Sequence, residues 1–178
     1  LQWGIPEAKI QMIYNGIGLP PNIPTYPKKK GEFLVVSAGR RVPWKGFEAI
    51  ERVVKKHKDE NWRLFIASGL PRVEALGWMK TADVFVLNSS YEGFPHVLIE
   101  AMTLGTPVVA TDARFHRTLL EHGKTGILIP LGDGDALEQA LLEIRSNPGT
   151  ASARARAPQA QKKEEKSPFH EKAKSILQ

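Results

Sequence analysis

Two patterns of apolar residues alternate along the chain: continuous apolar runs, and apolar residues at helical spacing. Runs that are apolar throughout and rich in β-branched and aromatic residues predict buried strands at 33–37, 62–67, 83–87, 107–111 and 127–129, and a run of mixed polarity predicts one more at 10–14. Between them, apolar residues at helical spacing predict helices at 47–54, 73–79, 95–104, 114–122 and 136–145. Strands that are apolar on both faces and alternate with helices predict an α/β fold with a doubly wound parallel sheet.

The length of 178 residues fits one domain, which we place at 1–150, followed by a basic tail at 151–178. The tail has seven Lys and Arg against three Asp and Glu, so it contributes +4 of the net charge of +6. We expect it to be partly disordered or to hold a terminal helix near 171–177. Weak contact with an acidic membrane surface is the second interpretation. No aromatic residues interleave its charges, which argues against nucleic-acid binding.

The composition also bounds the location of the protein. No apolar run is long enough to span a membrane, and the N-terminus lacks the basic-then-apolar form of a signal peptide. The absence of cysteine excludes disulfides and fits a reducing compartment. We therefore expect a cytoplasmic protein, free or peripheral to the inner face of the membrane. Because the sequence begins at Leu1 rather than Met, we expect a fragment or a processed form.

The stretch from Ala82 to Asp112 reads as strand, polar loop, helix and strand, and it organises the rest of the chain. Pro95 stands where the helix begins, and Gly105 ends it. A strand that leads into a helix N-terminus through a glycine-containing loop is a place to hold an anion. Two glutamates, Glu92 and Glu100, lie in this stretch with seven residues between them.

A second polar loop follows the predicted strand at 33–37. Arg40 comes directly after a glycine, and Lys45 lies just before the next helix. In an open parallel sheet ligands bind at the carboxyl ends of the strands, and an Arg and a Lys there suit a diphosphate. Solvated loop cations are the alternative for both, and we expect Arg41 to point to solvent.

Four stretches in this order, at 13–17, 39–47, 89–112 and 122–130, resemble a known family. The chain is similar to the C-terminal, donor-binding half of a retaining GT-B glycosyltransferase with the Glu-x7-Glu motif, in the family called glycosyl transferases group 1. The resemblance implies a Rossmann-like half of a GT-B fold. It also implies transfer of a hexosyl group from a nucleotide sugar to a lipid-linked or polysaccharide acceptor.

The resemblance gives roles to the charged residues of the two loops. Arg40 and Lys45 would neutralise the donor's diphosphate as the glycosidic bond breaks, and Glu92 would hold hydroxyl groups of the transferred sugar. We take these three as the catalytic residues. Glu100 would accept hydrogen bonds from the ribose.

The resemblance also gives roles to neighbours of Glu92. The backbone of Gly93, Phe94 and Pro95 would face the transferred sugar, and the amides near Val97 and Leu98 would face the phosphates. The donor is expected to be a UDP- or GDP-sugar. The resemblance implies no cofactor and no metal, because the two cations and the helix dipole take the place of a metal ion.

Three departures from the family pattern bear on this prediction. The N-terminal acceptor domain, the expected partner, is not in the sequence, so we expect little or no transfer by this chain alone. A helix-plus-strand unit that helps to hold the base is replaced by the short connection 68–71, either by deletion or because the sequence omits it. Arg114 and Phe115 replace a glycine-rich turn, and their bulk could crowd the sugar pocket.

These departures keep alternatives open. The first is a degenerate, non-catalytic module that binds a sugar nucleotide or serves interaction only, and the second is a fragment of a GT-B-type sugar-nucleotide epimerase. The surrounding phosphate-type site argues against a hydrolase that uses Glu92 and Glu100 as an acid and nucleophile pair. Four of the five histidines are expected at the surface or in loops: His57, His96, His116 and His122. His96 is the one to watch because it lies inside the motif.

Overall fold

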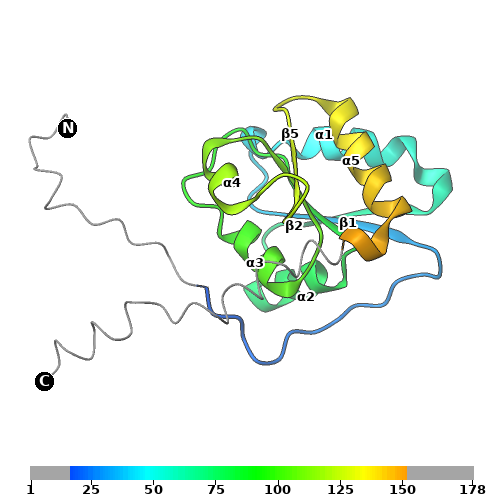
Figure 1. The fold of residues 1–178 in the computed structure, drawn as a ribbon. Coiled ribbons are helices and arrows are strands. Elements are labelled where there is room, and N and C mark those ends of the chain that lie inside the picture. Colours follow the sequence, from blue (N-terminus) through cyan, green and yellow to red (C-terminus); the bar gives the residue numbers. More distant parts are fainter. Residues whose placement is uncertain (1–16, 152–178) are drawn as a thin grey trace, which may run out of the picture.

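The computed structural model describes residues 17–151, so the predicted strand at 10–14 and the tail beyond Ala151 lie outside the described residues. Five parallel strands form one sheet in the order β2-β1-β3-β4-β5 (Figure 1). The strands are β1 Phe33–Ala38, β2 Trp62–Ala67, β3 Val84–Leu87, β4 Val108–Thr111 and β5 Ile127–Ile129. Each coincides within a residue or two with a predicted strand, because a continuous apolar run is what a strand buried on both faces requires.

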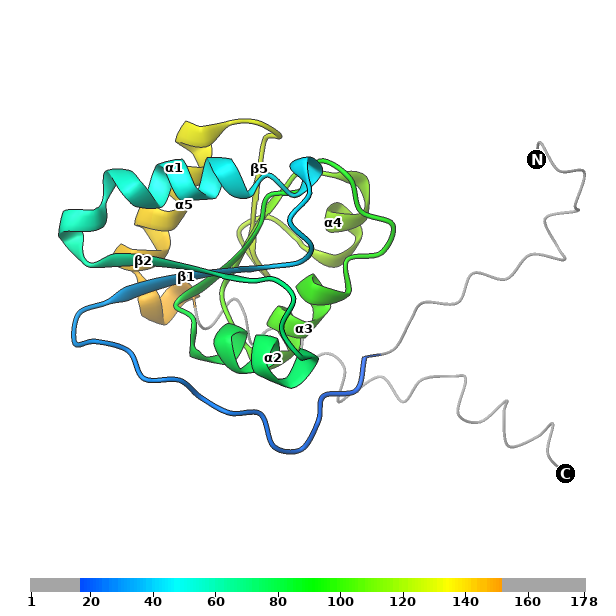
Figure 2. The same cartoon turned by 180° about the vertical axis from the view of Figure 1, so that it is seen from behind.

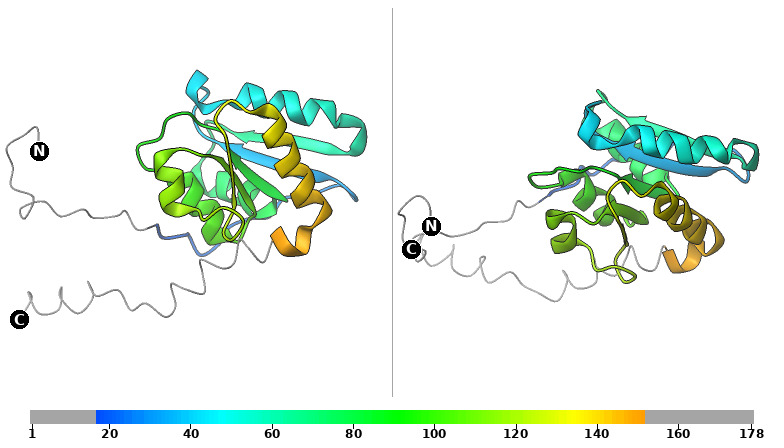
Figure 3. Two further views of the ribbon diagram at one scale, coloured as in Figure 1. Left: turned by 45° about the horizontal axis from the view of Figure 1, so that its top comes forward. Right: turned by 90° about the horizontal axis from the view of Figure 1, so that it is seen from above.

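Helices cover both faces of the sheet, so the doubly wound α/β fold is confirmed. They are α1 Phe47–Lys56, α2 Arg72–Thr81, α3 His96–Leu104, α4 Arg114–Leu119 and α5 Gly134–Ser146, with short 3-10 turns η2 Pro43–Lys45 and η3 Lys58–Glu60. Figure 2 shows the sheet between α1 and α5 on one side and α2 and α3 on the other. The turned views of Figure 3 show the same layers. Two apolar clusters result, one on each face.

Local features mark the ends of α3 and α5, whereas α4 ends earlier than predicted. Gly105 ends α3 in the left-handed conformation, with φ of 77°. The side chain of Asp133 caps α5, because its Oδ1 accepts a hydrogen bond of 2.8 Å from the amide of Ala136. The prediction that α4 extends to residue 122 is wrong. Leu120 is extended and 3 % exposed, so the chain leaves the helix there to bury this side chain in the core.

The segment that precedes β1, which is rich in proline and then in lysine, packs against α2. The amide of Tyr26 donates to Thr81 Oγ1 at 2.9 Å, and the ring of Tyr26 stacks on Trp78 with centroids 4.3 Å apart. Lys28 forms an ion pair with Asp83 at 2.6 Å. The segment is therefore part of the folded unit.

The order of the strands fixes where a ligand can bind. The chain moves from β1 outward to β2 and then returns past β1 to β3 on its other side, so the connections diverge between β1 and β3. At such a switch point the loops after the two strands leave a crevice at their carboxyl ends. β2 is an edge strand within the described residues, and only four residues, 68–71, connect it to α2.

Within residues 17–151, no helix combines the length and the apolar character that a membrane crossing needs.

A histidine-centred ion cluster joins α5 to the end of α1. Nδ1 of His57 lies 2.9 Å from Glu60 Oε1, and Nε2 lies 2.7 Å from Glu138 Oε1. The ring also stacks on Trp62, with centroids 4.3 Å apart. The hydrogen bond to Glu60, and then that to Glu138, raise the pKa of His57 above its ordinary value, since both carboxylates favour the imidazolium.

We predict that this cluster makes stability depend on pH. A raised pKa in the folded state stabilises the protein fully below the ordinary histidine pKa, and this gain is lost as pH rises through the raised value. The difference in unfolding free energy between the wild type and His57→Gln should therefore be larger near pH 5.5 than near pH 8, by about 0.5–1 kcal/mol. Urea unfolding at both pH values measures it, and the difference cancels other titrating groups. An equal difference at both pH values would contradict the prediction.

Candidate functional site

The loops after β1 and β3 are held together at the switch point between these strands. The side-chain amide of Asn88 donates to the carbonyl of Gly46 at 3.0 Å, and the amide of Ser90 donates to the carbonyl of Trp44 at 2.9 Å. Gly46 has φ of 62°, and a Cβ there would lie 2.4 Å from the backbone oxygen of Asn88. A glycine is required at this position, because any side chain would push the two loops apart.

This close approach brings Lys45 onto Glu92. The ammonium nitrogen lies 2.6 Å from Glu92 Oε1, and the two side chains are only 13 % and 14 % exposed. The stem of Lys45 crosses over Gly39, where a Cβ would lie 3.1 Å from Lys45 Cε. Two residues that the sequence places 47 positions apart thus share one shielded ion pair.

The two arginines of the β1 loop do not join this pair. Arg41 is exposed and lies 3.4 Å from Glu51, in agreement with the prediction that it points to solvent. Arg40 is also exposed, and its side chain has no hydrogen bond or ion pair with the part of the chain that the structure describes. The guanidinium of Arg40 is therefore available to a ligand at this edge.

Glu100 lies apart from this pair and has a cation of its own. It is the fifth residue of α3 and is 7 % exposed. Nε of Arg72, the first residue of α2, donates to Glu100 Oε1 at 2.7 Å. Each of the two motif glutamates is thus bound by a different cation, which does not resemble the shared site of an acid and nucleophile pair.

The start of α3 carries the remaining predicted residues. Gly93 is exposed, Phe94 is half-buried, and Pro95 is buried at the N-cap. The amide of Leu98 already donates to the carbonyl of Pro95 at 3.0 Å, whereas the amide of Val97 has no acceptor among the described residues. Of the two amides predicted to face phosphates, that of Val97 is the one open to an anion.

The structure corrects the prediction for His116, which is completely buried rather than at the surface. Nδ1 lies 2.7 Å from the carbonyl of Thr111, and Thr111 Oγ1 donates to the carbonyl of Ser89 at 2.6 Å, so the end of β4 is tied to the β3 loop. Burial lowers the pKa of His116, and the hydrogen bond to Thr111 opposes this. Because a carbonyl only accepts, Nδ1 carries the proton, and Nε2 is a buried acceptor without a partner among the described residues.

The apolar spacing misled the prediction at α4. Phe115 is an apolar residue of this helix, but it is 39 % exposed, and His116 takes the inward position. Arg114 lies over the ring of Phe115 at 5.9 Å, so both of the bulky residues that replace a glycine-rich turn are at the surface. A buried histidine that packs between loops leaves no apolar signal in the sequence.

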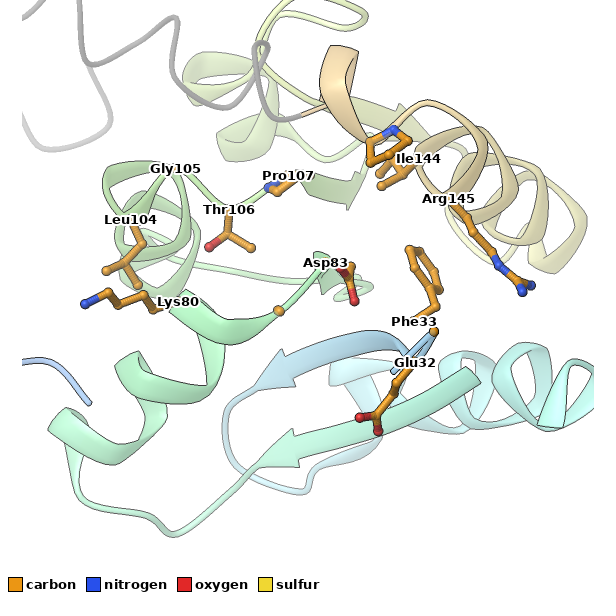
Figure 4. Close-up of a pocket in the computed structure, with 13 residues that line it drawn as sticks. Glu32, Phe33, Lys80, Asp83, Leu104, Gly105, Thr106, Pro107, Ile144 and Arg145 are labelled. Atoms are coloured by element: carbon orange, nitrogen blue, oxygen red, sulfur yellow. The ribbon is translucent and has the colours of Figure 1, made fainter. Parts of the chain in front are cut away.

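A cavity of about 450 Å³ lies at the opposite, amino ends of the strands (Figure 4). Its charged groups are already engaged by the protein: Lys80 donates to the carbonyl of Ile23, Asp83 pairs with Lys28, and Arg145 pairs with Glu60. None of the predicted site residues lines it. The candidate site is therefore the carboxyl edge.

Two solved structures share this fold. The chain superposes on Anabaena Alr3699/HepE in complex with UDP with a TM-score of 0.61 at 21 % identity, covering 74 % of this chain and 44 % of that one. For sucrose-phosphate synthase of Thermosynechococcus elongatus the TM-score is 0.60 at 25 % identity, covering 72 % and 40 %.

The sequence itself shows the family. Residues 67–164, more than half of the chain, match the family described as glycosyl transferases group 1. The chain belongs to this family. The match begins at the last residue of β2, so β1 and α1 lie outside it.

Two curated relatives illustrate the range of similarity. The chain is 46 % identical over 70 residues to the phosphatidyl-myo-inositol mannosyltransferase of Mycobacterium leprae, covering 39 % of this chain and 19 % of that protein. It is 28 % identical over 132 residues to the lipopolysaccharide core biosynthesis glycosyltransferase LpsE of Rhizobium meliloti, covering 62 % and 39 %. The chain thus spans about a fifth to two fifths of the length of these relatives.

We predict that Gly46→Ala destabilises the protein by about 3 kcal/mol or more, since it combines a left-handed backbone with a clash against Asn88. Gly132→Ala is the matched control, because Gly132 has φ of 79° but open space around its Cβ position. The control should lose only about 1–2 kcal/mol, the cost of the backbone conformation. Urea unfolding compares the two variants. Equal losses would show that the close approach of the loops does not contribute.

Proposed function

We propose that the chain is the donor-binding half of a retaining glycosyltransferase that uses a UDP- or GDP-hexose. The observation that carries the proposal is the Lys45–Glu92 ion pair at the switch point of the sheet, at 2.6 Å. It puts a cation suited to a phosphate and a carboxylate suited to sugar hydroxyls side by side. A nucleotide sugar presents these two groups next to each other, at the diphosphate and the hexose.

Binding of the donor would exchange the partners of this ion pair. The ammonium group of Lys45 would move from Glu92 to the diphosphate. Arg40, which has no partner among the described side chains, would provide a second cation. Glu92 would then accept hydrogen bonds from the hexose. As the bond between the anomeric carbon and the diphosphate oxygen breaks, the negative charge that grows on the leaving diphosphate is stabilised by the two cations.

The rest of the donor follows along the same edge. The open amide of Val97 at the start of α3 would meet a phosphate oxygen, and Glu100 would accept from the ribose. The solved structures of HepE contain UDP or UDP-glucose, which supports a nucleotide-sugar donor for this fold. The described residues hold no group of three side chains that could bind a metal ion. We propose that Arg40, Lys45 and the N-terminus of α3 stabilise the charge of the diphosphate.

The acceptor side is proposed from exposed apolar side chains. The large apolar residues exposed in the described chain all follow the carboxyl ends of strands: Trp44, Leu70, Val73, Tyr91, Phe115 and Leu131. An apolar rim around a charged crevice fits a surface that another domain or an acceptor covers. We propose an acceptor domain of the same protein as that partner. The relatives' names, which include lipopolysaccharide core and diphosphoundecaprenol transferases, support a lipid-linked or polysaccharide acceptor.

We predict opposite effects of two substitutions on nucleotide binding, measured by calorimetry with UDP, GDP and their hexose conjugates. Lys45→Met should weaken diphosphate binding about 10-fold or more, because it removes a charge-assisted hydrogen bond. Glu92→Gln should leave the affinity for UDP or GDP unchanged or tighter, since Lys45 no longer has a competing carboxylate. The same variant should lose the additional affinity that the hexose gives.

Arg41→Met is the matched control, because it removes a cation from the same loop at an exposed position. Arg41→Met should change the affinity for UDP or GDP, and for their hexose conjugates, by no more than about 2-fold. Binding should also be the same in EDTA and in Mg²⁺. If the folded wild type binds none of the four ligands, the proposal is wrong, and a non-catalytic module of the same fold takes its place.

A further inference from the structure

Arg72 has no role in the site described so far, yet it makes the contact that holds Glu100. We propose that Arg72 is a donor-site residue that positions Glu100 and itself contacts the ribose of the nucleotide. The inference rests on the proposed function, because it concerns the same ligand. Arg72 is the first residue of α2 and lies outside the loops at the switch point.

The guanidinium of Arg72 joins two distant parts of the chain. Nε donates to Glu100 Oε1 at 2.7 Å, and Nη2 donates to the carbonyl of Gly18 at 3.0 Å. Two hydrogen bonds fix the orientation of the planar guanidinium of Arg72, and the guanidinium in turn fixes the orientation of the Glu100 carboxylate. Since Glu100 is almost buried, its position depends on this one cation.

The pair leaves one acceptor and one donor for a ligand. Oε2 of Glu100 has no partner among the described residues and is not among the fully buried atoms that lack one, so solvent reaches it. Arg72 is 54 % exposed, and its Nη1 makes no bond within residues 17–151. A hydroxyl group donates one hydrogen bond and accepts another, so a pair of neighbouring ribose hydroxyls matches this acceptor and donor.

The direct connection from β2 to α2 is what brings Arg72 to this place. β2 ends at Ala67 and α2 begins at Arg72, with Gly69 making a left-handed turn at φ of 71°. The first residue of α2 therefore stands at the carboxyl edge of the sheet, beside the strands whose loops carry Lys45 and Glu92.

A structural role is the rival interpretation, in which Arg72 only fastens the segment at Gly18 to the domain. Lys80 offers a matched comparison, because it lies on the same helix and donates to the carbonyl of Ile23 in the same segment at 3.2 Å. Lys80 does not touch Glu100. If Arg72 only fastens the segment, substitutions of Arg72 and Lys80 should have similar effects. If Arg72 acts in the site, only the substitution of Arg72 should change the recognition of ribose.

The test is calorimetry with UDP and 2′-deoxy-UDP, or GDP and 2′-deoxy-GDP if guanine is the base that binds. The wild type should prefer the ribonucleotide by about 10-fold, the value of a hydrogen bond to a charged group. Arg72→Met should reduce this preference to about 2-fold or less, as should Glu100→Gln, and Arg72→Lys should keep part of it. Lys80→Met should keep all of it, and circular dichroism and thermal unfolding should confirm that each variant is folded.

The outcomes separate the two proposals. If the wild type binds the nucleotide but the preference for ribose is absent, or is the same in Arg72→Met, the role of Arg72 is refuted while the donor site stands. If Lys80→Met lowers the preference as much as Arg72→Met, Arg72 acts by fastening the segment, and the inference is again refuted. If no nucleotide binds the wild type, the proposed function fails, and the inference fails with it.

Discussion

The site depends on the close approach of two loops at Gly46. Only a glycine lets the β1 loop come within hydrogen-bonding distance of Asn88, and this contact sets Lys45 against Glu92. The approach lies where the sheet reverses its direction of winding, which is where the carboxyl ends of neighbouring strands leave room for a ligand. The charges of the site are thus a consequence of strand order combined with one missing side chain.

Without a ligand, Glu92 and Glu100 each form an ion pair with a cation of the protein. A largely desolvated carboxylate without a cation would be costly, so Lys45 serves Glu92 and Arg72 serves Glu100. Such pairs are weak contributors to net stability, because the cost of desolvation offsets most of the attraction. A ligand that supplies a new anion for one cation and hydroxyl groups for the freed carboxylate can replace the pair at little cost. The pairing therefore holds the site ready for a ligand that is both anionic and rich in hydroxyls.

The sequence predicted the strands and the switch-point loops well and the side-chain contacts poorly, for a physical reason. Strands such as β3 leave a continuous apolar run, and Gly105 is a local signal whose effect does not depend on distant residues. The partner of a charge, by contrast, is decided by tertiary structure: nothing near Arg72 in the sequence points to Glu100. His116 is the clearest failure, because a polar residue buried by loop packing breaks the apolar pattern that prediction uses.

The two ends of the sheet differ in how their charges are used, and this difference supports the choice of site. At the amino ends the charged side chains around the cavity bind other side chains or the backbone, so they are not open to a ligand. At the carboxyl ends Arg40, the amide of Val97 and Oε2 of Glu100 have no protein partner among the described residues. Because Arg40 is exposed and solvent reaches Oε2 of Glu100, a ligand can bind these groups without first breaking a contact within the protein.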